Sequence, residues 1–90
     1  MPPRDMGAKE IQYEILYRLY RRGCWGAKYL PTHSIVSWLG QLVRDDGHRV
    51  RVEIHELIGI GLLTSHKKGR TISLNSHMSK EIMDMLRDQA

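Results

Sequence analysis

Apolar residues recur at helical spacing near the start of the chain and again at its end. Between residues 8 and 22 they fall three or four positions apart, which predicts an amphipathic helix. A last helix is predicted to begin at Asn75 or Ser76. The expected buried faces are Ile11, Ile15, Leu16 and Leu19 in the first helix and Met78, Ile82, Met85 and Leu86 in the last. Residues 1–7 hold two prolines and a glycine without periodicity, so we expect a loose tail before one domain over residues 8–90.

Two more helices are predicted in the middle of the chain, separated by a short break. Pro31 and Thr32 are typical of a helix start, with Thr32 as the N-cap, and this helix is expected to extend to about Arg44. The sequence Asp45-Asp46-Gly47 predicts a tight turn, and Asp46 is expected to cap the third helix. The predicted inward positions are Ile35, Leu39, Leu42 and Val43 in the second helix and Val50, Ile54, Leu57, Ile58 and Gly61 in the third. The outward positions of the third helix are then His48, Arg49, Arg51, Val52, His55 and Glu56.

The region after the third helix has the pattern of a β-hairpin. Residues 62–66 and 71–74 read as strands, with Lys67-Lys68-Gly69-Arg70 as the turn between them and Ile72 and Leu74 on one buried face. A further short strand is predicted over residues 27–30. The predicted order is helix, short strand, helix, helix, hairpin and helix, which is a mainly α fold with a small β-hairpin, in the α+β class.

This order of elements resembles the winged helix-turn-helix domain of prokaryotic and archaeal transcriptional regulators. The stretch VRVEIHELIGIGLLTSHKKGRTISLN looks like that family's recognition helix followed by its basic hairpin, called the wing. Gly40 matches the small residue at which the family's second and third helices cross. The resemblance covers roughly residues 8–86 and implies a protein that binds double-stranded DNA, with its third helix in the major groove and its wing on the backbone.

The charged residues suggest which side chains would contact DNA. The chain carries a net charge of +4, which favours an anionic partner. Arginine can reach guanine edges or phosphates through its planar head, and lysines at a hairpin tip can lie along the backbone. Thr32, at the start of a helix, could hold a phosphate. The candidate DNA contacts are Thr32, His48, Arg49, Arg51, Val52, His55, Lys67, Lys68 and Arg70.

Other interpretations of the same residues stay open. Arg49 and Arg51 are offset by Glu53 and Glu56, so the third helix is close to neutral. A neutral third helix is also expected if the domain is a protein–protein module in a larger assembly. A basic hairpin could instead grip RNA by its shape, and a glycine with lysines is also common in ordinary solvated turns.

A second apolar stripe on the first helix raises the question of a homodimer. Tyr13, Tyr17 and Tyr20 lie beside the expected core face, and the last helix carries several methionines. These tyrosines could flank the core with their hydroxyls in water. They could also join Met78 and Met85 in a two-fold contact through the first and last helices.

Several other classes of protein are not expected. The single cysteine, Cys24, rules out an internal disulfide, and neither it nor the five histidines have a metal-ligand spacing. No nucleophile with a base and no glycine-rich phosphate loop is recognisable, so we expect neither catalysis nor a cofactor. No apolar run approaches the roughly 20 residues that cross a membrane. We therefore expect a cytoplasmic, non-enzymatic protein.

Overall fold

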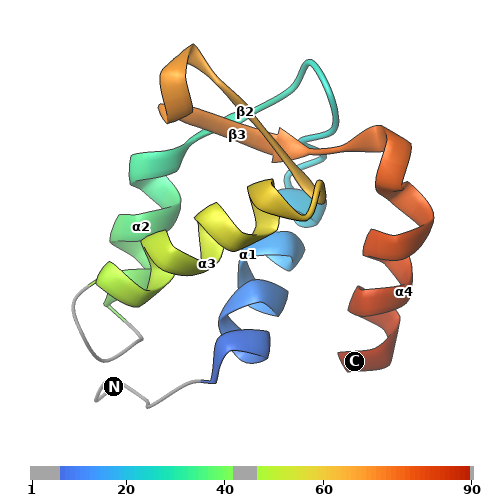
Figure 1. Cartoon of the computed structure of the whole chain (residues 1–90), viewed down its shortest axis with the longest axis horizontal. Coiled ribbons are helices and arrows are strands. Elements are labelled where there is room, and N and C mark those ends of the chain that lie inside the picture. Colours follow the sequence, from blue (N-terminus) through green and yellow to red (C-terminus); the bar gives the residue numbers. More distant parts are fainter. Residues whose placement is uncertain (1–6, 42–46, 90) are drawn as a thin grey trace.

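The computed structural model describes residues 7–41 and 47–89, which contain four α-helices and a three-stranded antiparallel sheet (Figure 1). The helices are α1 (Ala8–Arg21), α2 (Thr32–Gly40), α3 (His48–Gly59) and α4 (Ser79–Gln89). The strands are β1 (Leu30–Pro31), β2 (Leu63–His66) and β3 (Thr71–Leu74). Two 3₁₀ turns, η1 (Lys67–Gly69) and η2 (Ser76–Met78), precede β3 and α4. The α+β class is confirmed, and the helices and strands follow one another in the predicted order.

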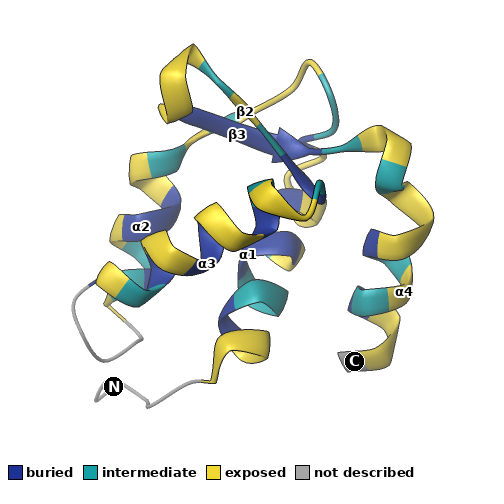
Figure 2. Cartoon of the chain, in the orientation of Figure 1, coloured by how far each residue is buried: buried dark blue, intermediate teal, exposed yellow. Residues whose placement is uncertain are grey.

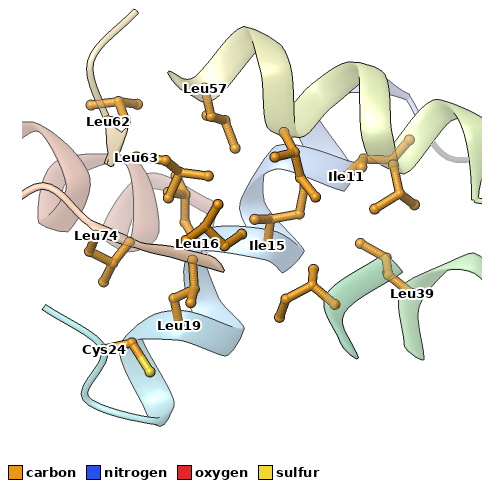
Figure 3. Close-up of a cluster of buried hydrophobic side chains, with 14 of the residues drawn as sticks. Ile11, Ile15, Leu16, Leu19, Cys24, Leu39, Leu57, Leu62, Leu63 and Leu74 are labelled. Atoms are coloured by element: carbon orange, nitrogen blue, oxygen red, sulfur yellow. The ribbon is translucent and has the colours of Figure 1, made fainter. Parts of the chain in front are cut away.

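The first helix forms the centre of the core. It contacts α2, α3, α4 and β3, and its predicted inward residues Ile11, Ile15, Leu16 and Leu19 are fully buried (Figure 3). Leu57 of α3 and Leu74 of β3 point into the same cluster. Each such side chain contributes about 1.5–3 kcal/mol by leaving water. The core therefore lies between α1 and the elements around it, and the outer sides of α2, α3 and α4 remain exposed (Figure 2).

The sheet has the order β1-β3-β2, so β3 is its central strand. All four β3 residues are buried, although the alternating pattern predicted that only Ile72 and Leu74 would be. Thr71 and Ser73, whose side chains alternate with Ile72 and Leu74, are buried as well. The Ser73 hydroxyl and the His66 ring are joined at 3.2 Å. Beyond the strand, the Gly26 N–H donates to the Leu74 carbonyl at 3.0 Å.

Three predicted boundaries move in the structure. β1 is Leu30–Pro31 rather than residues 27–30, because a turn closed by the Lys28 N–H and the Trp25 carbonyl takes up the preceding residues. α2 begins at Thr32, whose side chain makes no cap; Pro31 occupies the N-cap position. The predicted last helix opens as η2, with the Asn75 side chain accepting from the His77 N–H at 3.0 Å, and α4 proper starts three residues later.

The break between α2 and α3 is described only at its edges. The predicted continuation of the second helix through Leu42 and Val43 to Arg44, together with Asp45 and Asp46, lies outside the described residues. The N-cap position of α3 is Gly47, one residue later than predicted. Gly47 has φ +89°, and a Cβ there would lie 3.0 Å from Cγ1 of Val36. Glycine is therefore required at this position both for backbone conformation and for the close approach of α2.

The buried face of α3 includes one residue that the hydrophobic pattern did not predict. Val50, Ile54 and Leu57 are buried as expected, but Glu53 is buried with them, at 9% exposure. Its Oε1 accepts a hydrogen bond from Nε2 of Gln12 on α1 at 2.8 Å. Ile58 and Gly61, predicted inward, are only half-buried. Among the described residues, no helix has the length and apolar character that crossing a membrane requires.

Candidate functional site

A groove runs between the outer side of α3 and the tip of the β2–β3 hairpin. It has a volume of about 360 Å³. Arg51 and His55 line it from α3, and Lys68 lines it from the tip. Its remaining lining residues are Thr32, Ile54, Ile58, Ser65 and Gly69. Two of the predicted third-helix contacts and one of the predicted hairpin contacts thus border a single hollow, which we call the basic groove.

Among the residues that the structure describes, none that lines the basic groove is acidic, although α3 carries two glutamates. An α-helix turns 100° per residue, so Glu53 lies about 160° and Glu56 about 140° around α3 from Arg51. Glu53 also faces α1, where Gln12 bonds to it. Of the two arginines that make α3 neutral by composition, Arg51 therefore lies away from both carboxylates.

A second hollow continues the same surface onto α2. It has a volume of about 290 Å³ and shares Arg51 with the basic groove. His33, Ser37 and Gln41 line it from the exposed side of α2, together with Val36 and Gly40. The sequence interpretation did not include these three polar residues. Their spacing of four positions, which puts them on one helix face, is the signal that could have found them.

The hairpin tip has an unusual backbone. Lys67, Lys68 and Gly69 have φ values of +51°, +58° and +85°, so three successive residues are left-handed. The turn is closed by the Arg70 N–H, which donates to the Lys67 carbonyl at 3.2 Å. A left-handed conformation costs a residue other than glycine about 1–2 kcal/mol. The tip is therefore a strained turn at two lysines and an unstrained one at Gly69.

Thr32 attaches this tip to the start of α2. Its backbone N–H donates to the Arg70 carbonyl, and its hydroxyl donates to the Gly69 carbonyl, both at 2.8 Å. The sequence interpretation assigned Thr32 to a phosphate. In the structure both of its donors are engaged within the chain, so Thr32 acts as the support of the hairpin tip.

The two tip lysines have different surroundings. Lys68 lines the basic groove. Lys67 instead places its Nζ 5.1 Å from the centre of the Tyr29 ring, which in turn lies 5.3 Å from the His66 ring. Arg70 is exposed and lines neither hollow. Of the three predicted hairpin contacts, only Lys68 shares the groove with α3.

The remaining predicted contacts on α3 lie on two different sides of the helix. His48 and Val52 are exposed and lie about 60° and 100° around the helix from Arg51, so they extend the groove side of α3. Val52 is 43% exposed, which is high for a valine. Arg49 is half-buried and lies about 160° from Arg51, beyond Glu56. Arg49 is thus separated from the groove.

Cys24 is a buried side chain rather than part of this site. It is 4% exposed, and burial raises the pKa of its thiol while the charges of Arg22 and Lys28 act in the opposite direction. A neutral buried thiol is a poor nucleophile and a poor metal ligand. In residues 7–41 and 47–89, no group of three or more His, Cys, Asp or Glu side chains could hold a metal ion.

The arrangement as a whole can bind an extended polyanion, because cations lie on both walls of one groove and its described lining residues include no carboxylate. Comparison of the chain with protein-family models, with curated proteins and with solved structures finds no match.

Proposed function

We propose that this protein is a DNA-binding protein of the winged helix-turn-helix type, and that the basic groove is its interface with duplex DNA. The observation that carries the proposal is that Arg51, His55 and Lys68 lie around one groove in which no described lining residue is acidic. In this proposal α3 enters the major groove and the hairpin tip lies against the sugar-phosphate backbone.

The dimensions and chemistry of α3 support this arrangement. Its 12 residues give a length of about 18 Å, and the major groove of B-DNA, about 12 Å wide, admits an α-helix. Arg51 can donate two hydrogen bonds to guanine, and the exposed methyl groups of Val52 can contact a thymine methyl. Lys68 then neutralises a phosphate beside the helix. In this proposal α3 reads sequence and the tip adds affinity.

RNA and a protein partner are the competing occupants of this surface. The major groove of A-form RNA is too deep and narrow for a helix to read, so RNA would engage the hairpin tip without α3. Binding of a protein partner would not need Arg51 and Lys68 to act together, and its affinity would not need to fall as the salt concentration rises. The competition between these occupants can be measured directly.

Fluorescence anisotropy with duplex DNA at two salt concentrations tests the proposal. We expect binding that weakens at higher salt, because each neutralised phosphate releases counterions. Lys68→Ala should weaken binding to every sequence alike and reduce the salt slope by about 1. Arg51→Ala should cost about 1–3 kcal/mol on a preferred sequence and little on others.

Lys80→Ala is the matched control, since Lys80 is an exposed lysine on α4, away from the groove. Its affinity for DNA should equal that of the unmodified protein. Absence of DNA binding at low salt, or equal effects of the Lys68 and Lys80 variants, would refute the proposal. Equal competition by double-stranded RNA would favour the RNA alternative.

A further inference from the structure

The outer face of α1 lies on the opposite side of the molecule from the basic groove. Gln12 points to α3, where it bonds to Glu53. Around the axis of α1, Tyr17 lies about 140° from Gln12, and Arg21 about 180°. Figure 1 shows α3 crossing in front of α1, so the outer face of α1 is turned away from the exposed side of α3.

This outer face is aromatic and partly open. Tyr17 and Tyr20 are 38% and 40% exposed, and the rings of Tyr13 and Tyr17 are stacked with centres 5.7 Å apart and planes 14° from parallel. The Arg21 guanidinium lies 5.9 Å from the centre of the Tyr17 ring. These aromatic side chains are held in place by their neighbours, so little side-chain freedom would be lost on contact with a partner.

Tyr17 stands as a ridge between two hollows. Toward α4 is a hollow of about 230 Å³, lined by Tyr13, Tyr17, Tyr20, Met83, Leu86 and Arg87. Toward α2 is one of about 280 Å³, lined by Glu14, Tyr17, Arg18, Arg21 and Trp38. Tyr17 therefore projects between the two hollows, where its ring can meet another aromatic ring at the centre of a contact. The three tyrosines that the sequence suggested for a dimer all line the hollow toward α4. The two suggested methionines, Met78 and Met85, line neither hollow, whereas Met83 lines the one toward α4.

The charges on this face change sign along the helix. The first half of α1 carries Glu10 and Glu14, and the second half carries Arg18 and Arg21. Among the residues that the structure describes, none forms an ion pair with Glu14. Two copies of this face in parallel would set like charges against each other, while an antiparallel pair would set glutamates against arginines. The charge pattern therefore selects one orientation of a self-contact.

We propose that a second copy of this chain binds to the outer face of α1, antiparallel and about a two-fold axis at Tyr17. Glu14 stands three residues before Tyr17, and Arg21 stands four after it. A two-fold axis at Tyr17 therefore brings Glu14 of each copy to Arg21 of the other, on either side of a central tyrosine contact. α1 is only about 21 Å long, so this interface falls in the small, reversible class below about 1,200 Å².

This orientation has a consequence for DNA, which rests on the proposed function. The interface lies opposite the basic groove, so the two grooves of the pair face away from each other, across two molecular thicknesses of 22 Å each. Such a pair cannot place both grooves on one straight duplex. It holds two duplexes at once and bridges them.

Self-association is tested first, without DNA, by sedimentation equilibrium from micromolar to submillimolar concentration. The unmodified chain should dimerise reversibly, and Tyr17→Ala should weaken the dimer about tenfold or more. Tyr29→Ala is the matched control, because Tyr29 is 40% exposed but lies beside the hairpin. A chain that stays monomeric throughout, or equal effects of the two tyrosine variants, would overturn the proposal.

Charge reversal tests the antiparallel orientation. Glu14→Arg alone should weaken the dimer, since it sets arginine against Arg21 of the other copy. Adding Arg21→Glu should restore it, since the opposite charges are then exchanged but matched. Thermal melts of both variants check that the monomer remains folded. If the double variant dimerises no better than the single one, the proposed orientation is wrong.

Bridging is tested with one duplex fixed on beads and a second, fluorescent duplex in solution. The unmodified protein should retain the fluorescent duplex, and Tyr17→Ala should lose this retention while it still binds a single duplex in solution. Lys68→Ala should keep its self-association and weaken binding to both duplexes. If the proposed function is wrong, the protein will form dimers that bind no DNA. If the bridging inference is wrong, the Tyr17 variant will still retain the fluorescent duplex.

Discussion

Lys68 holds a backbone conformation that lysine rarely adopts. Its φ is +58°, and Lys67 before it has φ +51°, so the hairpin tip contains two left-handed lysines in succession. The sequence identified these residues as a cluster of cations on a turn. It gave no sign that their backbones are strained or that Lys68 lines the basic groove while Lys67 contacts Tyr29. If the groove binds DNA, the strain at Lys68 is retained because a cation is needed at that point.

We therefore expect stability and DNA binding to change in opposite directions at Lys68. Lys68→Asn should raise the free energy of unfolding by about 0.5–1 kcal/mol, because asparagine tolerates the left-handed region better. The same change should weaken DNA binding, because it removes a charge from the groove. Urea denaturation and anisotropy measure the two effects.

Lys67→Asn is the paired control for that experiment. It relieves the same kind of strain but removes a charge outside the groove, so we expect a similar stability gain with a smaller loss of affinity. Equal losses of affinity in the two variants would contradict the distinction between the two lysines.

At the scale of elements, the contact between α2 and the hairpin matters most for the site. Thr32 makes two hydrogen bonds to the tip, and these residues are about 37 positions apart in the chain. The sequence predicted the helix start and the hairpin turn, but treated Thr32 as a local cap. A side chain that could cap its own helix instead bonds to a distant carbonyl, and only the folded arrangement makes that partner available.

Thr32→Val should loosen the tip without changing the shape of the side chain. The loss of the hydrogen bond to the Gly69 carbonyl should cost about 0.5–1.5 kcal/mol in the free energy of unfolding. DNA binding should weaken as well, because Lys68 is then less firmly positioned. Thr32→Ser keeps the donor and should behave nearly like the unmodified protein in both measurements; if it is as impaired as the valine variant, the hydrogen bond is not the cause.

At the scale of the whole molecule, the rotation of α3 against α1 determines which side chains face outward. Val50, Ile54 and Leu57 face α1 together with the polar pair of Gln12 and Glu53. This rotation turns both glutamates of α3 away from Arg51 and makes the groove basic. The hydrogen bond between Gln12 and Glu53 thus helps to keep the Glu53 carboxylate away from Arg51 on α3.

The Gln12–Glu53 pair is testable by a double-mutant cycle. Gln12→Leu should destabilise the fold by about 1–3 kcal/mol, because the buried Glu53 carboxylate loses its donor. Combining it with Glu53→Leu should recover most of that loss, because two apolar residues then fill the same space. Chemical denaturation of the double variant and of both single variants, Glu53→Leu alone included, completes the cycle. Additive losses in the double variant would show that the pair is not coupled.

The sequence by itself determined the elements and their order. Hydrophobic residues at helical spacing fixed the inward face of α1, and the glycine-tipped basic segment fixed the position of the hairpin. These signals are local, since helical and strand periodicity depend on neighbours a few positions apart. The bounds of β1 and the burial of Thr71 and Ser73 were not predicted correctly, because they depend on pairing and packing with distant residues.

The tertiary structure alone decided which predicted residues act together. It joined Arg51, His55 and Lys68 around one groove, separated Arg49 and Lys67 from them, and engaged Thr32 within the chain. It also turned the tyrosine face of α1 to the side opposite the groove. The physical reason is that helix rotation and hairpin placement follow from packing between elements far apart in sequence, and a charge total carries no information about either.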